Sequence, residues 1–217
     1  SKLGAINSRS WDKVVMQGQS TLDLAKPGDA TKLIATTRQL ADVLRSRNPK
    51  VELFLMATWS RADQTYPEKG AWFGKPIEAM ARDVRIGNDK AAAGADIKTV
   101  IPVGEAWTRA IQKGVADPNP YDGLDAGKVD LWTYDHYHAS TSGYYLEALV
   151  VFGTLTGRDP RSLGENECSG YELGLQMPLV AALEQVAFEQ LDAAGLVSTA
   201  ASAPPKPAAA ERCVAHR

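Results

Sequence analysis

The sequence predicts an α/β fold in which helices cover both faces of a parallel sheet. Three short apolar runs, at residues 14–16, 51–56 and 100–103, have the length and composition of buried strands. Longer segments whose apolar residues recur at helical spacing follow each of these runs. Strands that alternate with helices are normally joined in parallel, and the helices then pack on both faces of the sheet.

The first strand and the first long helix are bounded by residues that stop regular structure. The strand at residues 14–16 runs up to Gly18, and the helix is expected over residues 31–46. Asn48-Pro49 ends this helix, because the residue before a proline avoids the helical region. The residues expected on the apolar face of the helix are Leu33, Ile34, Leu40, Ala41 and Leu44.

A long polar and aromatic loop separates the second strand from the next helix. This loop covers residues 58–75, and Pro76 suits the first turn of a helix that reaches residue 91. The third strand is expected to end at Gly104, and a helix over residues 105–115 carries Trp107 into the core. The carboxyl ends of parallel strands form the usual ligand-binding edge of such a sheet. We therefore expect three loops to meet there: residues 17–20, residues 58–61 and the loop that holds Asp135 and His138.

Two more helices complete the predicted domain. A short extended piece at residues 131–134 leads into a helix for which Ser140 or Ser142 is the N-cap and Gly157 the end. Its apolar face is expected to hold Tyr145, Leu146, Leu149 and Val150. A last helix turns Leu179, Val180, Leu183, Val186, Ala187 and Leu191 inward. We assign residues 1–197 to one domain and residues 198–217 to an Ala/Pro-rich flexible tail.

Composition narrows the classes of partner. The 217 residues include 24 Lys+Arg and 26 Asp+Glu, a balance that offers no basic surface for nucleic acid. No apolar run approaches the roughly 20 residues that span a bilayer, so we expect no membrane span. Cys168 and Cys213 are either a disulfide formed in an oxidising compartment or two unrelated thiols. We expect no metal and no cofactor.

Asp135 and His138 are the strongest candidates for acid–base chemistry. The third histidine, His216, lies in the tail, which leaves His136 and His138 as the imidazoles of the domain. In a turn, a carboxylate three residues before His138 can accept a hydrogen bond from one ring nitrogen and leave the other free to take a proton. Two alternatives stay open: Asp135 and His138 only fix the loop before the helix, or they join His136 in a metal site.

Four ordered segments resemble the SGNH (GDSL-like) hydrolases, in particular a bacterial subgroup. The last conserved block of that family, in which an Asp-x-x-His pair precedes a helix, resembles residues 134–160. The segments WDKVVMQGQS (residues 11–20), VELFLMATWSR (residues 51–61) and IPVGEAW (residues 101–107) resemble the subgroup. The resemblance covers about residues 11–160. It implies a serine-type carboxylic ester hydrolase on a three-layer α/β/α fold with a flavodoxin-like sheet.

The resemblance also implies roles for individual residues. By position, His138 is the general base, Asp135 is its orienting acid, and the amide of Gly18 helps to hold the oxyanion. The family's Gly-Asp-Ser or Gly-Asn-Ser nucleophile turn is not found here, and no Gly-x-Asn-Asp block follows the second strand. We therefore expect the nucleophile in a segment upstream of this chain, which leaves the sheet incomplete at its N-terminal side. The alternative nucleophile is Ser20, in a Gly-Gln-Ser turn.

Substrate and compartment are less closely constrained. Trp59 and Arg61 lie in the long loop, where they either line a substrate cleft or pack the loop against the domain. Acyl or acetyl esters, including those of carbohydrates, are the expected substrates. The rival hypothesis is a non-catalytic carbohydrate-binding or scaffold protein on the same fold. We expect a periplasmic or extracellular location, because esterases of this kind often act on envelope polymers and the two cysteines permit export.

Overall fold

A computed structural model describes residues 2–164 and 168–197 of the chain. The chain divides into two compact units, each of which contains two separate stretches of sequence. The first unit comprises Ser1–Ser60 and Glu78–Gly104, and the second comprises Arg61–Ile77 and Glu105–Arg217. The two units are described in turn below.

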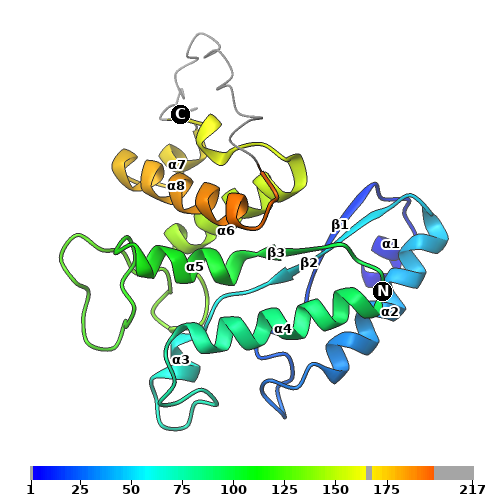
Figure 1. Ribbon diagram of the computed structural model, residues 1–217, viewed down its shortest axis with the longest axis horizontal. Helices are drawn as coiled ribbons and strands as arrows, with labels where there is room; N and C mark the ends of the chain where they lie inside the picture. Colours follow the sequence, from blue (N-terminus) through cyan, green and yellow to red (C-terminus); the bar gives the residue numbers. More distant parts are fainter. Residues whose placement is uncertain (1, 165–167, 198–217) are drawn as a thin grey trace. The chain divides into compact units, whose positions relative to one another are not determined.

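The first unit contains a parallel three-stranded sheet (Figure 1). Its elements are α1 (Lys2–Asn7), β1 (Lys13–Gln17), α2 (Thr31–Arg47), β2 (Glu52–Ala57), α4 (Glu78–Gly94) and β3 (Thr99–Pro102). The strand order is β1-β2-β3, and Val15 lies opposite Phe54 in the first ladder. The predicted α/β class with a parallel sheet is confirmed. The sheet and its flanking helices are consistent with the expected three-layer α/β/α fold.

The core of this unit forms between the central strand and two helices. Every residue of β2 after Glu52 is buried, as expected for a continuous apolar run in a parallel sheet. The helix α4 lies against β2 and β3, and α2 packs against α4. Leu33, Ala41 and Leu44 of α2 are buried as predicted, whereas Ile34 and Leu40 are half-buried. Thr37 completes the buried face although it is polar.

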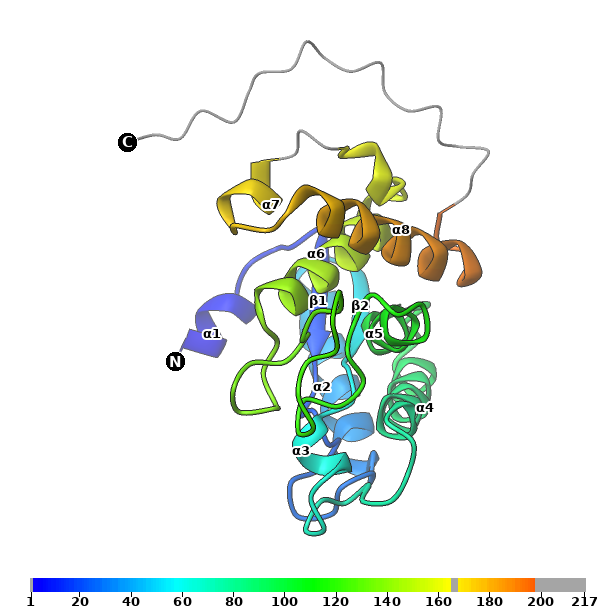
Figure 2. The same cartoon turned by 90° about the vertical axis from the view of Figure 1, so that its left-hand side faces the viewer.

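The second unit consists of helices and long connections (Figure 2). Its elements are α3 (Ala62–Thr65), most of α5 (Val103–Gln112), α6 (Thr141–Thr156), the short 3₁₀ helix η1 (Pro160–Ser162), α7 (Cys168–Glu172) and α8 (Met177–Ala193). The helix α8 packs along α6 and η1. The residues predicted to face inward from α6 are all buried, and so are those predicted for α8 except Leu179, which is half-buried.

Several boundaries differ from the sequence prediction. Val103 was expected in the third strand but is the first residue of α5, and a short helix, α3, interrupts the loop at residues 58–75. The early start of α5 reflects a close approach of backbones, because a Cβ atom at Gly104 would collide with the carbonyl oxygen of Thr58. Val103 is apolar and β-branched, so its composition alone favours a strand.

Two further predictions concern membranes and cysteines. Among the described residues, no helix combines the length and apolar character needed to cross a membrane. Cys168, the first residue of α7, does not carry a free thiol. Its possible partner Cys213 and the predicted tail at residues 198–217 lie outside the described residues.

Candidate functional site

The candidate site is built on a tight turn between residues 131 and 140. Trp132 and Ala139 form an antiparallel bridge across this turn. Inside it, the amide of Thr133 donates to the carbonyl of His138 at 2.8 Å, and the amide of His136 donates to the carbonyl of Thr133 at 2.9 Å. His136 adopts a left-handed backbone conformation with φ of 56°, which lets the chain reverse within a few residues.

The turn is anchored to the start of α6. Ser140 is the N-cap, as one of the two alternatives predicted, and its Oγ accepts a hydrogen bond from the amide of Gly143 at 3.3 Å. The same Oγ donates to the carbonyl of Asp130 at 2.8 Å. A Cβ atom at Gly143 would collide with the carbonyl oxygen of Leu131 and lie 2.6 Å from the Trp107 ring. The helix start, the turn and the buried Trp107 therefore pack without space for a larger residue.

The predicted hydrogen bond between Asp135 and His138 is present. Oδ2 of Asp135 lies 2.6 Å from Nδ1 of His138. Oδ1 of Asp135 accepts hydrogen bonds from the Thr133 hydroxyl at 2.7 Å, from the His138 amide at 2.9 Å and from the Tyr137 amide at 3.0 Å. One carboxylate thus orients the imidazole and also fixes the turn before the helix. From the sequence alone these two roles were alternatives, and the structure shows both contacts together.

The electrostatics of this pair suit an ionised carboxylate. The hydrogen bond from His138 is the largest of the causes that hold the pKa of Asp135 well below its ordinary value, followed by the hydrogen bond from Thr133. The His138 side chain is 56% exposed and that of Asp135 is 31% exposed. No hydrogen bond to Nε2 of His138 is found within the described ranges. This nitrogen is therefore available to exchange a proton with a substrate or a nucleophile.

Stacked side chains hold the imidazole from a second side. The ring centroid of Tyr137 lies 4.1 Å from that of His138, and the Arg61 guanidinium lies 3.6 Å above the Tyr137 ring. Arg61 is fixed in turn by Asp63, to which it donates two hydrogen bonds of 2.9 and 2.6 Å. The Arg61 side chain is only 11% exposed. This geometry favours a positioning role for Arg61 over direct binding of substrate.

His136 contacts different residues from those that His138 contacts. Its ring lies against Tyr121, with 4.3 Å between the centroids, and its carbonyl oxygen accepts a hydrogen bond from the amide of Asp63. The metal alternative assumed that His136 and His138 lie on a strand, whereas they lie in a turn. Within the part of the chain that the structure describes, no group of three His, Cys, Asp or Glu side chains is arranged to hold a metal ion.

The other candidate residues follow the strands of the first unit. Gly18 and Ser20 come directly after β1, and a Cβ atom at Gly18 would lie 2.6 Å from Cδ1 of Leu33. The side chain of Gln19 holds this turn, since its Oε1 accepts hydrogen bonds from both the amide and the hydroxyl of Thr21 at 2.6 Å. Ser20 is half-buried.

Two of the three loops expected at the ligand edge do share it. Residues 18–20 and 58–60 follow the carboxyl ends of two directly paired parallel strands. Trp59 is only 7% exposed, which favours packing over contact with substrate. The third loop, with Asp135 and His138, belongs to the second unit, so its convergence with the other two stays a prediction.

Sequence reasoning missed Thr133, Tyr137 and Asp63 as members of the site. The Thr-x-Asp spacing of Thr133 and Asp135 was a usable signal, because a hydroxyl two residues away is a common local partner of a carboxylate. The contact between Arg61 and Tyr137 joins residues that are distant in sequence. Only the folded chain reveals that contact.

Comparisons with known proteins bear on the fold. No protein-family model matches the chain, and no curated protein sequence matches it significantly. A solved structure, that of a DUF4886 family protein from Bacteroides uniformis, is similar to it with a TM-score of 0.65 and 20% sequence identity. The similarity covers 91% of this chain and 69% of the other. At this level of identity the likeness supports the α/β fold and carries no information on activity.

Proposed function

We propose that the protein is a serine-type carboxylic ester hydrolase of the SGNH type that uses Asp135 and His138. The observation that carries the proposal is the 2.6 Å contact between Oδ2 of Asp135 and Nδ1 of His138, combined with the exposed position of the imidazole. A carboxylate bonded to Nδ1 fixes the tautomer in which Nε2 is unprotonated and basic. The expected substrates are acyl or acetyl esters, including those of carbohydrates.

In the proposed mechanism, His138 moves one proton in each half-reaction. A serine hydroxyl attacks the ester carbonyl carbon while Nε2 of His138 takes the hydroxyl proton. The resulting oxyanion is held by backbone amides, including that of Gly18. When the intermediate collapses, the alcohol leaves with the proton from Nε2, and the acyl group stays on the serine. Water then attacks the acyl group by the same route, so the acid is released and the serine is restored.

The serine belongs, in this proposal, to a segment upstream of residue 1. The coding sequence before Ser1 is the first test, because a Gly-Asp-Ser or Gly-Asn-Ser turn after an apolar strand is expected there. The alternative is Ser20, in the turn after β1. Treatment of the protein with a fluorophosphonate, followed by peptide mass mapping, separates the two, since the reagent labels the activated serine.

The activity is tested with the full-length gene product and p-nitrophenyl acetate. We expect His138→Ala to lower kcat at least a thousandfold and to leave the unfolding midpoint within the range of ordinary surface substitutions. The matched control is His136→Asn, which removes an imidazole from the same turn and suits the left-handed backbone at that position. Equal loss of activity in both variants, or no hydrolysis by the unmodified protein, contradicts the proposal.

An exposed aromatic residue favours a second candidate function, carbohydrate binding without catalysis. Tyr134, directly before Asp135, is 94% exposed and offers a flat amphipathic surface beside the turn. Titration calorimetry with acetylated and unacetylated oligosaccharides tests this function. Binding that Tyr134→Ala abolishes, in a protein that hydrolyses no ester, supports a binding protein over an enzyme.

A further inference from the structure

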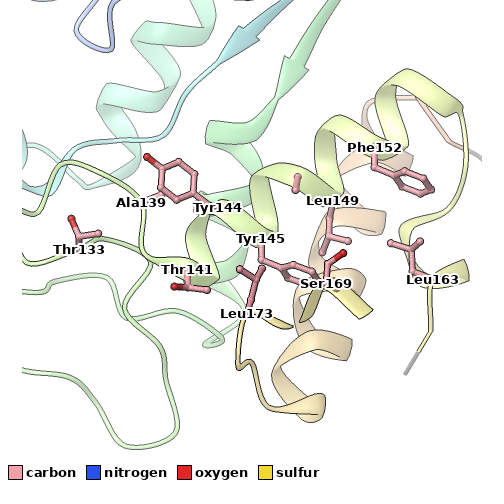
Figure 3. Close-up of a pocket in the computed structure, with 11 residues that line it drawn as sticks. Thr133, Ala139, Thr141, Tyr144, Tyr145, Leu149, Phe152, Leu163, Ser169 and Leu173 are labelled. Atoms are coloured by element: carbon pink, nitrogen blue, oxygen red, sulfur yellow. The ribbon is translucent and has the colours of Figure 1, made fainter. Parts of the chain in front are cut away.

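The second unit contains a cavity of about 580 Å³ beside the turn that carries Asp135 and His138 (Figure 3). One wall is formed by α6, from which Tyr144, Ala148 and Phe152 contribute side chains. Leu163 and Leu173, from the chain on either side of α7, lie opposite. This volume lies within the range of pockets that bind small molecules.

The chemistry of the lining restricts the ligand. None of the eleven lining residues is charged, and most present hydrocarbon or aromatic surface. Leu163, Leu173 and Tyr144 are partly exposed, so water currently contacts apolar surface that a ligand would cover. A charged headgroup would lose hydration here without gaining a partner of opposite charge. The site therefore suits a hydrocarbon chain.

Two residues connect the cavity to the proposed catalytic pair. Thr133 lines the cavity and also donates the 2.7 Å hydrogen bond to Asp135. Ala139 lines it too and directly follows His138. A ligand in the cavity thus contacts the same turn that orients the imidazole.

The lining extends along α6. The lining residues on this helix run from Thr141 to Phe152, a distance of roughly 16 Å along the helix axis. That distance is comparable to half of the ~30 Å hydrocarbon core of a bilayer, which is the reach of one long acyl chain. We propose that this cavity binds the acyl chain of the ester substrate, so that the preferred substrates are long-chain acyl esters. This inference rests on the proposed function and specifies its substrate class.

A binding experiment tests the cavity independently of hydrolysis. Dodecanoic acid, kept below its micelle concentration, is titrated into the protein in a calorimeter. Ala148→Phe places a ring in the cavity from an exposed position of α6, and the matched control is Ala181→Phe at an exposed position of α8. We expect at least a tenfold loss of affinity in the first variant and less than a twofold change in the second. Absent binding, or equal losses in both variants, overturns the proposal.

A hydrolysis experiment separates this inference from the function on which it rests. With the full-length gene product, kcat/KM for p-nitrophenyl esters is expected to rise about fourfold per added methylene until the cavity is filled. Ala148→Phe should remove this rise, whereas the control Ala181→Phe should keep it and leave acetate hydrolysis within twofold of the unmodified enzyme. A flat chain-length profile in an active enzyme overturns the inference but not the function. The opposite outcome is an unmodified protein that hydrolyses no ester, while Ala148→Phe alone loses dodecanoic acid binding. That outcome overturns the function and supports the cavity as an apolar-chain site.

Discussion

Replacing Asp135 by asparagine exchanges one carboxylate oxygen of the candidate site for an amide nitrogen. The side-chain oxygen of the introduced asparagine can still accept the hydrogen bonds that Thr133, Tyr137 and His138 donate to Oδ1. The amide nitrogen of the asparagine takes the place of Oδ2, which lies 2.6 Å from Nδ1 of His138. This nitrogen is a hydrogen-bond donor and faces Nδ1. A neutral imidazole must then accept at Nδ1 and carry its proton on Nε2. Asp135→Asn thus preserves the turn but removes the base.

The structure predicts different losses of unfolding free energy for two substitutions of Asp135. Asp135→Ala removes four hydrogen bonds, three that fix the turn and one to the imidazole. At a net ~0.5–1 kcal/mol each for a partly exposed site, their loss costs about 2–4 kcal/mol. Asp135→Asn loses only the charge-assisted bond, or about 1 kcal/mol, because the exposed imidazole is well solvated. The wrong tautomer lowers kcat of an active enzyme by about 10³–10⁴.

The tautomer of His138 can be measured directly by ¹⁵N NMR, without any enzymatic activity. We expect the Nδ1–H form in the unmodified protein at a pH above the imidazole titration, and the Nε2–H form in Asp135→Asn. An Nε2–H imidazole in the unmodified protein, or an identical tautomer in both proteins, refutes the reasoning. Urea unfolding supplies the second readout, in which Asp135→Ala must be less stable than Asp135→Asn.

The same carboxylate gives a pH dependence with a defined sign. The pKa of Asp135 is lowered in the folded protein, so its ionised form stabilises the fold. This contribution is complete above the ordinary pKa of 3.8 and is lost as the pH falls below that value. The difference in unfolding free energy between the unmodified protein and Asp135→Asn should therefore shrink as the pH falls below about 4. A difference that grows as the pH falls below about 4 contradicts this assignment.

Three further substitutions test the packing around the site by urea unfolding. Gly143→Ala should lower the unfolding free energy by about 1–3 kcal/mol, because the added Cβ has no space, and an unchanged midpoint would contradict the close packing. Arg161→Ala should cost about 2–3 kcal/mol by leaving the buried Asp159 carboxylate without its cation, with Arg161→Lys intermediate. Glu147→Gln should stabilise by about 1 kcal/mol at pH 7, because burial raises the pKa of Glu147, and this gain should vanish in acid.

Features that depend on local sequence were predictable, and those that depend on distant contacts were not. The strands, the long helices and the bond between Asp135 and His138 involve residues that are close in sequence, where spacing alone determines which side chains can meet. The stacking of Arg61 on Tyr137 and the start of α5 at Val103 depend on chain segments brought together by folding. The roles of Trp59 and Arg61 were left open for the same reason, since burial is a property of the fold.

The strand order bears on where the nucleophile can lie. In a flavodoxin-like sheet of order 2-1-3-4-5, the first strand lies between the second and the third. If β1 and β2 correspond to the second and third strands of the SGNH sheet, a nucleophile strand from an upstream segment must replace the direct ladder that now pairs Val14 with Leu53. A nucleophile at Ser20 leaves that ladder unchanged, because Ser20 lies beyond its end. Nuclear Overhauser effects between the backbones of β1 and β2 in the full-length gene product therefore indicate which segment contains the nucleophile. Their loss is expected with an upstream serine, and their persistence favours Ser20.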